Sequence, residues 1–408
     1  MAQAKHKVVI VGGGAAGIAA AASMLRRRPD LDIAILDGAS DHFYQPGWTM
    51  VGGGVFDVPV TRRSMASVIP RGATWIAQNV STFDPDNNRL TTANGDTISY
   101  DLLVAAPGIK LDWEQIEGLS DTLGQNGVTS NYGYGTSPYT WELVQAMKRG
   151  RALFTQPPMP IKCAGAPQKS MYLSCDHWMR NGVLDDVEVQ FRNAGGVLFG
   201  VEAYVPALMS YVDKYGVDLQ LESNLVAVDG PGQTATFKNK DGEEQVEFDM
   251  IHVVPPQVAP DFIRESALAG ESGFVDVHQF SLQHNTYPNV FGLGDGCSTP
   301  NAKTAAAARK QAPVVAVNGL AVLDGKEPTV AYDGYGSCPL TVERGKIVLA
   351  EFGYGGKLMP SFPKWLVDGT KPAKLSWMLK ADALPWIYWN GMLKGREWLA
   401  GPGNMIAQ

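Results

Sequence analysis

The sequence predicts an α/β protein with two domains of similar design, followed by an amphipathic C-terminal segment. A buried-strand run, Lys7–Val11, leads directly into a glycine-rich turn and an Ala-rich helix, and a second strand, helix, strand pattern begins near Val187. The 45 glycines and a charged fraction of only 18% fit parallel strands buried on both faces. A chain of 408 residues is long enough for two such cores.

The first domain opens on a glycine turn, Gly12-Gly-Gly-Ala-Ala-Gly17, between its first strand and first helix. Gly12 permits the tight turn, Gly14 lets backbone N–H groups approach a pyrophosphate, and Gly17 allows close packing of helix on strand. A second strand ends at Asp37, 20 residues beyond Gly17, where a carboxylate would accept hydrogen bonds from a ribose. This context predicts a Rossmann-like dinucleotide site.

A distant segment, residues 287–296, favours FAD over NAD as the dinucleotide. It reads as a short buried strand that delivers Asp295 to its carboxyl end, where ligands of such sheets bind. Lys303, Thr304, Ala305 and Ala306 then start a helix whose N–H groups could stabilise negative charge on a reduced flavin. The alternative for Lys303 is a solvated lysine in the first turn.

The second domain begins a similar unit but lacks a complete nucleotide turn. After the strand Val187–Phe191 the chain reads Asn193-Ala-Gly-Gly, so the first glycine is absent, and Leu198 and Phe199 crowd the approach to a pyrophosphate. We therefore expect that NAD(P)H binding has been lost and that another donor supplies electrons. We assign residues 1–112 and 279–328 to the FAD domain, 113–278 to the second Rossmann-like domain, and 329–408 to a C-terminal quinone and membrane-interface region.

Four cysteines occur, with no CxxC and no Cys/His cluster at metal-ligand spacing, so we expect no metal and a catalytic rather than a structural disulfide. Cys163 lies beside Lys162 and just ahead of a predicted helix N-terminus, a setting that stabilises a thiolate. Cys338 lies in a Gly- and Pro-bounded turn that we expect to expose it. The alternative for each is an inert buried thiol, and packing is the interpretation favoured for Cys175 and Cys297.

The C-terminal segment changes character between Phe362 and Trp398. It holds five of the ten tryptophans interleaved with lysines and arginines, although the net charge of the chain is −7. No apolar run there approaches the length of a membrane span, so we expect short helices, broken by Pro385 and Gly391, lying in a membrane interface with their cations toward headgroups. The alternative is a surface that covers another subunit. The acidic net charge argues against nucleic acid as a partner.

With these motifs together, the chain resembles the sulfide:quinone oxidoreductases, in the two-cysteine branch that includes the mitochondrial enzyme of animals and its bacterial relatives. The resemblance runs nearly end to end and is most specific around the two cysteines. Some members of the wider superfamily carry a third redox cysteine within residues 123–134, where this chain has Val128 and no thiol. The motifs that carry the resemblance are His42–Trp48, Ile161–Lys169, Gly294–Ser298, Lys303–Ala306, Tyr332–Leu340, Ala350–Phe352 and Pro385–Asn390.

The resemblance implies a non-covalent FAD with a cysteine pair on one face and a membrane quinone at the other. Cys338 would take sulfur from hydrogen sulfide as a persulfide, and Cys163, released as a thiolate, would attack flavin C4a. A small acceptor (sulfite, a thiol or sulfide) would remove the sulfur. Phe352 and Tyr354 would line the quinone pocket. The flavin-contacting positions would be Gly12, Gly14, Ala15, Ala16, Gly17, Asp37, Gln45, Val80, Gly108, Asp295, Lys303, Thr304, Ala305 and Ala306.

The location implied is the cytoplasmic face of a bacterial inner membrane, since the first residues run straight into a strand and leave no room for a cleaved leader. The sequence leaves the oligomeric state open, a homo-oligomer included. Three alternatives remain at this point: a type II NADH:quinone oxidoreductase, the flavin subunit of a periplasmic sulfide dehydrogenase, and a non-enzymatic membrane-bound flavin and thiol redox sensor. The first would need an intact second nucleotide turn, and the second an export signal.

Overall fold

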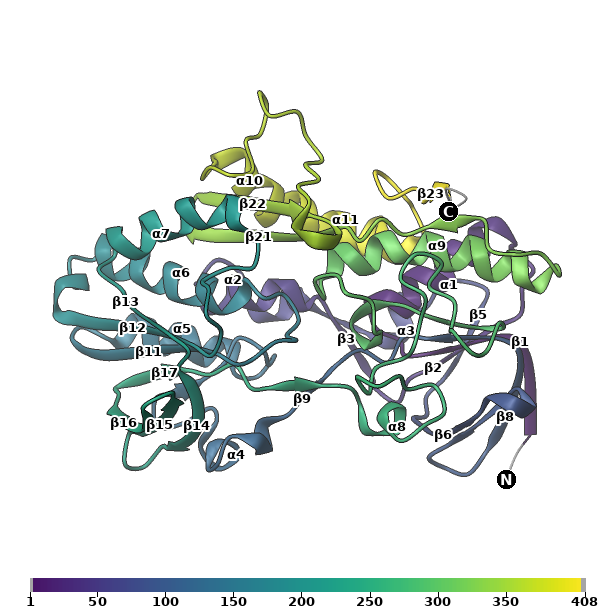
Figure 1. Ribbon diagram of the computed structural model, residues 1–408, viewed down its shortest axis with the longest axis horizontal. Coiled ribbons are helices and arrows are strands. Elements are labelled where there is room, and N and C mark those ends of the chain that lie inside the picture. The colour runs from purple at the N-terminus through teal and green to yellow at the C-terminus, as the bar shows by residue number, and fades with distance from the viewer. Residues whose placement is uncertain (1–2, 405–408) are drawn as a thin grey trace.

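The computed structural model describes residues 3–404 and shows two α/β domains side by side, with the C-terminal part of the chain lying along one edge of both (Figure 1). The first domain is built on a seven-stranded sheet of order β5-β2-β1-β8-β7-β6, with β19 also paired to β8. Its strands are β1 Gln3–Val11, β2 Ile33–Leu36, β5 Ala73–Ile76, β6 Val80–Asp84, β7 Arg89–Thr92, β8 Thr97–Ala105 and β19 Val290–Gly292.

Side chains of β1 alternate between the two faces of this sheet. Val8 and Ile10 belong to a core cluster with helices α1 (Ala15–Arg27) and α9 (Ala305–Leu323), whereas Val9 lies in a separate cluster on the opposite face. A parallel strand covered on both faces confirms the predicted α/β class of domain.

The register of the parallel strands decides where the functional segments meet. Val11 lies opposite both Leu36 and Ala105, and Ala105 lies opposite Gly292. The four segments that follow these residues therefore leave the sheet at a single edge, the carboxyl edge at which such sheets bind ligands.

The second domain has a parallel five-stranded sheet of order β10-β17-β11-β12-β13, flanked by helices α5, α6 and α7 and extended by an antiparallel meander. Its helix α6 begins at Ala166, just after Cys163, where the sequence predicts a helix N-terminus. The elements are β10 Val128–Thr129, α5 Ser137–Ala146, β11 Gly150–Gln156, α6 Ala166–Arg180, β12 Val187–Asn193, α7 Val205–Lys214, β13 Asp218–Leu221, β14 Asn224–Asp229, β15 Thr234–Asn239, β16 Gly242–Glu247 and β17 Met250–His252.

Two short antiparallel strands, β9 (Lys110–Leu111) and β18 (Gln257–Val258), form the crossing between the domains. The helix just beyond, α8 (Asp261–Arg264), already returns to the first sheet, where Phe262 stacks on Phe83 of β6. The chain therefore contacts the first domain well before residue 279. The domain bounds themselves stay a prediction.

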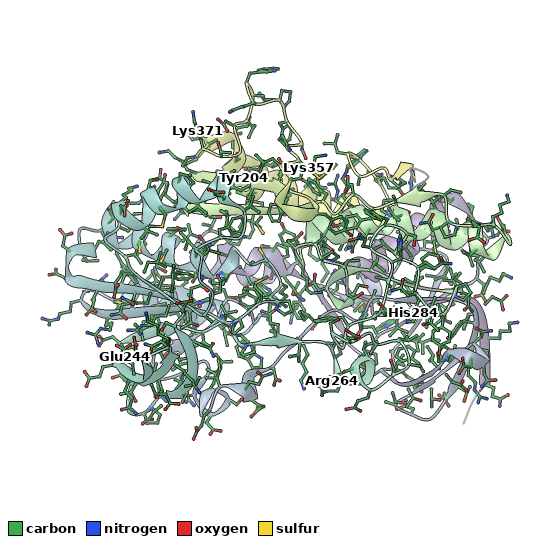
Figure 2. The ribbon with its side chains drawn as sticks, in the orientation of Figure 1. Tyr204, Glu244, Arg264, His284, Lys357 and Lys371 are labelled. Atoms are coloured by element: carbon green, nitrogen blue, oxygen red, sulfur yellow. The ribbon has the colours of Figure 1, made fainter. Side chains whose placement is uncertain are left out.

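The C-terminal hairpin of β21 (Gly336–Glu343) and β22 (Lys346–Phe352) packs on α6 of the second domain. Tyr204 lies next to this hairpin (Figure 2), and its hydroxyl donates to the Glu351 carbonyl at 3.0 Å and accepts from the Glu351 N–H at 3.0 Å. The hairpin is thus fixed to the second domain, while the helices that follow it return to the first.

Those helices differ from the prediction. Pro385 does not break the helix: α10 (Lys374–Met378) continues through a π-helical turn, Leu379–Ala383, into α11 (Leu384–Asn390). The wider turn accommodates a proline that has no N–H to donate. The chain does turn at Gly391, and Met392–Lys394 then pack on α1. None of the helices within residues 3–404 is long and apolar enough to cross a membrane.

The expectation that the cations of this segment face headgroups is wrong at Lys380, and one of the tryptophans, Trp389, is buried as well. Lys380 is buried, and its Nζ donates to the Pro46 carbonyl at 3.0 Å. Trp389 is buried in the core of the first domain, where Arg63 lies over its ring at 4.2 Å. Part of the amphipathic pattern in this segment therefore reflects the packing of one helix face against the first domain.

The remaining elements are short. They connect the two sheets or pin the C-terminal segment to the first domain. Their bounds are β3 Asp41–Phe43, α2 Trp48–Gly52, β4 Arg62–Ser64, α3 Met65–Val68, α4 Leu119–Thr122, β20 Val330–Ala331 and β23 Gly403–Asn404.

Candidate functional site

The turn after β1 is shaped so that backbone groups can approach a phosphate. Gly12 has a φ of +107°, and a Cβ there would stand 2.2 Å from the Ala106 carbonyl oxygen. A Cβ at Gly17 would stand 2.0 Å from the Gly12 oxygen, whereas one at Gly14 would meet nothing within 4 Å. The first and third glycines therefore allow close backbone packing, and Gly14 faces open space at the N-terminus of α1.

The peptide of Gly13 is held from both sides. Its N–H donates to Asp37 Oδ2 at 2.7 Å, and its carbonyl lies 3.0 Å from His42 Nδ1. Asp37 Oδ1 also accepts from the Ala39 N–H at 2.8 Å. Each carboxylate oxygen has a second lone pair, so Asp37 can still accept hydrogen bonds from a ribose.

Asp295 and Lys303 meet at the same edge of the sheet. Lys303 Nζ donates to the carbonyl of Asp295 at 2.7 Å and to that of Cys297 at 2.8 Å. Lys303 is buried rather than solvated, which removes the alternative weighed for it. Burial raises the pKa of the Asp295 carboxyl, and the nearby Lys303 and Lys162 oppose that rise. Thr304 caps α9 by accepting from the Ala307 N–H, which orients the helix N-terminus toward this edge.

The other predicted flavin positions lie around the same edge. Ala15 and Ala16 are part-buried at the first turn of α1. Val80 is buried at the start of β6. Gly108 has a φ of +71°, and a Cβ there would meet nothing within 4 Å. Their assignment to flavin contacts stays a prediction.

The two predicted redox cysteines come together although 175 residues separate them. Both are free thiols, and they lie close enough for each to shift the pKa of the other. The interaction holds the pKa of Cys163 well below, and that of Cys338 well above, the ordinary thiol value. Lys169 Nζ lies 3.1 Å from Cys163 Sγ, so Cys163 is the thiolate of the pair and Cys338 the thiol.

The surroundings of Cys338 differ from the expectation. Cys338 does not lie in an exposed turn: it is the third residue of β21, opposite Ala350 of β22, and is fully buried. The prediction failed because Pro339 reads as a turn residue, whereas a two-stranded hairpin has edges on which a proline needs no ladder partner.

Cys163 precedes α6 as expected, but its charge partner is not the neighbouring Lys162. Lys162 Nζ turns away and donates to Gln45 Oε1 at 2.7 Å. Lys169, one turn into the helix, instead lies with its Nζ 3.1 Å from Cys163 Sγ. The contact with Cys338 has the largest effect and lowers the pKa of Cys163, whereas burial raises it. Two cations lower this pKa further, Lys169 more than Lys380. Cys163 also has a left-handed φ of +51°, a strained conformation for a residue with a side chain.

Gly165 allows the two cysteine segments to approach. A Cβ at this position would stand 2.2 Å from Leu340 Cδ2 and 3.7 Å from Cys338 Cβ. The Cys163 N–H meanwhile donates to the Lys303 carbonyl at 2.7 Å. The thiol pair is thus tied by backbone to the N-terminus of α9, beside the predicted flavin site.

The remaining two cysteines have the packing role predicted for them. Both are fully buried, Cys175 in the core of the second domain and Cys297 in a small cluster of the first. Burial raises the pKa of Cys175 far above the ordinary thiol value and that of Cys297 to about 12. Neither is a thiolate near neutral pH.

The second nucleotide turn is filled by its own side chains. Asn193 Oδ1 accepts from the Gly195 N–H at 2.8 Å, and Asn193 Nδ2 donates to the Val197 carbonyl at 2.8 Å. Leu198 and Phe199 are buried in the core of this domain. The turn therefore presents an asparagine side chain where a pyrophosphate site needs open backbone.

Phe352 and Tyr354, the predicted quinone residues, follow β22 but join different clusters. Phe352 lies edge-on to Phe199 of the second domain, with ring centroids 6.0 Å apart. Tyr354 packs on Tyr332, and its hydroxyl donates to the Gln279 carbonyl at 2.6 Å. They lie where the two domains adjoin, and their role stays a prediction.

The residues around the thiols fit an FAD. The buried donor Trp48 Nε1 has no hydrogen-bond partner within residues 3–404. Its ring lies 5.9 Å from Lys162 Nζ. An unpaired donor here, together with the open space at Gly14 and Gly108, matches a group that brings phosphate and carbonyl acceptors.

Sequence reasoning assigned no role at the thiol pair to Lys169, Lys380 or Gly165. A signal existed for Lys169, because side chains in the first turns of a helix lean toward its N-terminus, where Cys163 lies. No local signal marks Lys380, which arrives from a segment more than 200 residues further along the chain.

Comparison with known proteins gives matches over most of the chain. The family model of the pyridine nucleotide-disulphide oxidoreductases matches residues 6–137. The chain is 41% identical to the mitochondrial sulfide:quinone oxidoreductase of Dictyostelium discoideum, over 90% of this chain and 80% of that protein. It is 40% identical to the Mus musculus protein of the same name, over 89% of this chain and 81% of that one.

Among solved structures, the sulfide:quinone oxidoreductase of Aquifex aeolicus matches with a TM-score of 0.79 at 20% identity, over 96% of this chain and 92% of that chain. At that identity the likeness shows a shared fold.

Proposed function

The chain belongs to the sulfide:quinone oxidoreductase family and has FAD as its cofactor, and from this premise we propose that it oxidises hydrogen sulfide and passes two electrons to a membrane quinone. The observation that carries the proposal is the contact between Cys163 and Cys338 with Lys169 at 3.1 Å from Cys163 Sγ. Bound FAD would supply the two-electron relay between the thiol pair and the quinone.

The first step is thiol–disulfide exchange on the oxidised pair. HS⁻ attacks Cys338 Sγ, the bond between Cys338 and Cys163 breaks, and Cys338 becomes a persulfide while Cys163 leaves as a thiolate. Lys169 stabilises that leaving thiolate, which explains why sulfide attacks Cys338 and not Cys163. The low pKa of Cys163 makes it the better leaving group of the two.

The second step returns the pair to its disulfide. A nucleophilic acceptor (sulfite, a thiol or a second sulfide) attacks the outer sulfur of the Cys338 persulfide and leaves with it, so that Cys338 is again a thiol. Cys163 and Cys338 would then return to their disulfide by losing two electrons and two protons, and bound FAD would supply the acceptor for those electrons. The net reaction joins one sulfur atom to the acceptor and reduces one quinone to quinol.

Electron supply from NAD(P)H does not fit the second domain. Asn193 closes the turn onto itself, and Phe199 contacts Phe352 of the C-terminal hairpin. This favours sulfide over a pyridine nucleotide as donor, against a type II NADH:quinone oxidoreductase.

The quinone would enter from a membrane to which the chain binds peripherally through its C-terminal segment. Trp365, Trp386 and Trp398 are among the exposed large apolar side chains there. We keep Phe352 and Tyr354 as candidates for the quinone pocket and the cytoplasmic face of a bacterial inner membrane as the location, noting that the matched relatives are mitochondrial.

The test is rapid mixing of the FAD-loaded protein with sulfide, followed by flavin absorbance. Sulfide should bleach the flavin within the time of one turnover, NADH should not, and a short-chain quinone should restore the absorbance. Cys338→Ser should lower the rate of sulfide-dependent bleaching by about a thousandfold or more, because the sulfur atom loses its attachment point.

Cys175→Ala serves as the matched control, since that thiol lies more than two turns along α6 from Cys163. A Cys338→Ser protein that turns over at the wild-type rate would reject the mechanism. Rapid bleaching by NADH would reject the choice of donor.

A further inference from the structure

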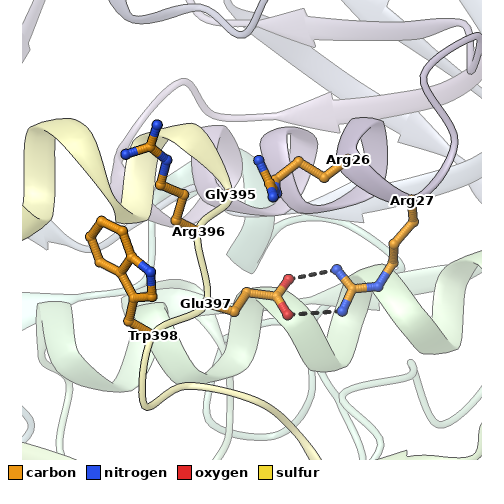
Figure 3. A pocket seen from close by; sticks show the side chains of 6 residues that line it. All are labelled: Arg26, Arg27, Gly395, Arg396, Glu397 and Trp398. Carbon is orange, nitrogen blue, oxygen red and sulfur yellow. Dashed lines mark hydrogen bonds and ion pairs between the residues drawn. The ribbon is translucent and has the colours of Figure 1, made fainter.

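A basic pocket lies where the C-terminal segment meets the end of α1. It has a volume of about 520 Å³ and is lined by Arg26, Arg27, Gly395, Arg396, Glu397 and Trp398 (Figure 3). None of these residues takes part in the thiol or flavin site described above.

Three arginines and one carboxylate line this pocket, and only Arg27 pairs with that carboxylate. Glu397 accepts from Arg27 with both oxygens, at 2.5 and 2.8 Å, and also from the Ser23 hydroxyl. Figure 3 shows Arg396 turned away from that ion pair. Neither Arg26 nor Arg396 forms a salt bridge with an acidic residue of 3–404, so the pocket keeps an excess positive charge in a protein whose net charge is −7.

The loop that carries Arg396 packs closely against α1, so the walls of the pocket are held in place. Gly395 has a φ of +66°, and a Cβ there would stand 2.6 Å from the Ala22 carbonyl oxygen and 2.8 Å from Arg26 Cδ. Only a glycine lets this loop lie directly on α1. Arg309 of α9 donates to the Trp398 carbonyl and so fixes the opposite wall.

Exposed apolar side chains lie next to the arginines of the pocket. Trp398 stacks on Trp386 of α11, with ring centroids 5.6 Å apart and planes at 5°. Trp386 is 54%, Trp398 44% and Leu399 71% exposed. Arginines beside exposed tryptophans form the combination that sits at a lipid headgroup layer, with rings in the interface and cations on phosphate. Arg26 and Arg27 also complement the C-terminal dipole of α1, but that role does not account for Arg396, which comes from another element.

We propose that this pocket binds the phosphate of an anionic phospholipid, with Arg26 and Arg396 as its ligands and Trp386 and Trp398 in the adjacent interface. The proposal rests on the peripheral membrane binding proposed above. It adds a headgroup preference that the apolar surface alone does not provide.

The test is flotation of the full-length, FAD-loaded protein with vesicles of phosphatidylcholine alone or with about one third phosphatidylglycerol. Wild type should bind the anionic vesicles more tightly. Arg26→Gln with Arg396→Gln should lose roughly 30-fold in affinity for them, the effect expected of two cations at a membrane surface. Its binding to neutral vesicles and its FAD content should not change.

The matched control is Lys238→Gln with Lys240→Gln, which removes the same charge from the exposed β15–β16 hairpin. Equal losses from the two double variants would overturn the proposal, because they would show an unspecific charge effect. Displacement by inorganic phosphate, but not by chloride of equal ionic strength, would assign the pocket to free phosphate instead.

The neutral vesicles separate this proposal from membrane binding itself. Wild type that binds both vesicle types equally overturns the headgroup site and leaves membrane association standing. Wild type that binds neither overturns the association on which it rests.

Discussion

Lys169 Nζ lies 3.1 Å from Cys163 Sγ, inside a site where Cys338 contacts the same sulfur. Burial works against the charge of Lys169, but attraction to Cys163 and Cys338 raises its pKa above the ordinary lysine value. The pair is therefore an ammonium and a thiolate in the reduced protein, and each keeps the other charged.

Lys169→Met should slow alkylation of Cys163 by iodoacetamide in the reduced protein, by roughly tenfold near neutral pH, because less of the thiol is ionised. Mass spectrometry of the labelled peptide measures it site by site. Lys162→Met is the control, since that lysine donates to Gln45 and not to the sulfur. Equal slowing in both variants would argue against a specific pair.

Lys380 should make stability depend on pH. Burial, followed by repulsion from Lys169, lowers its pKa to about 7, against an ordinary value of 10.5. Between those values the unfolded chain binds more protons than the folded one, so the free energy of unfolding rises with pH. The contribution is roughly 2 to 3 kcal/mol from about pH 7 to about pH 9.

Urea denaturation at both pH values measures this rise, and Lys380→Met should remove it. Lys371→Met, at an exposed position of the same segment, should leave it unchanged. A Lys380→Met protein with the wild-type pH slope would contradict the burial of this ammonium.

His42 connects the nucleotide turn to the C-terminal helix. Its Nδ1 must donate to the Gly13 carbonyl, so its Nε2, at 2.7 Å, accepts from the Tyr388 hydroxyl. Tyr388→Phe leaves that nitrogen buried without a donor, and we expect FAD to bind roughly tenfold more weakly. Fluorescence titration of the apoprotein with FAD measures the affinity.

Tyr172→Phe is the control for that titration, because it deletes a buried hydroxyl bonded to the Leu208 carbonyl in the second domain. Unaltered FAD affinity in Tyr388→Phe would show that the helix and the nucleotide turn are independent.

Gly165→Ala should slow formation of the Cys163–Cys338 disulfide, because the added methyl group meets Leu340 at 2.2 Å and forces α6 and β21 apart. Quenched oxidation by glutathione disulfide, read by mass spectrometry, follows the reaction. Leu340→Ala in the same chain should restore part of the rate. If the double variant were slower than Gly165→Ala, the steric explanation would fail.

Much of this protein can be predicted from local patterns. The glycine turn, Asp37 and the segment ending at Asp295 each have a spacing set by the strand that carries them, and parallel strands bring their carboxyl ends together. The degenerate turn at Asn193 can likewise be recognised from a short stretch of sequence. The two-domain fold and the family follow from such segments.

Tertiary structure alone decided the rest. The partners of Cys163 come from α6, β21 and the C-terminal helix, and sequence distance carries no information about which of them meet. Cys338 reads as an exposed turn residue, and Lys380 as a headgroup cation, because burial of a polar group depends on what the fold places over it. The sequence determined which elements form and what each can bind, whereas packing between elements fixed which sulfur is charged.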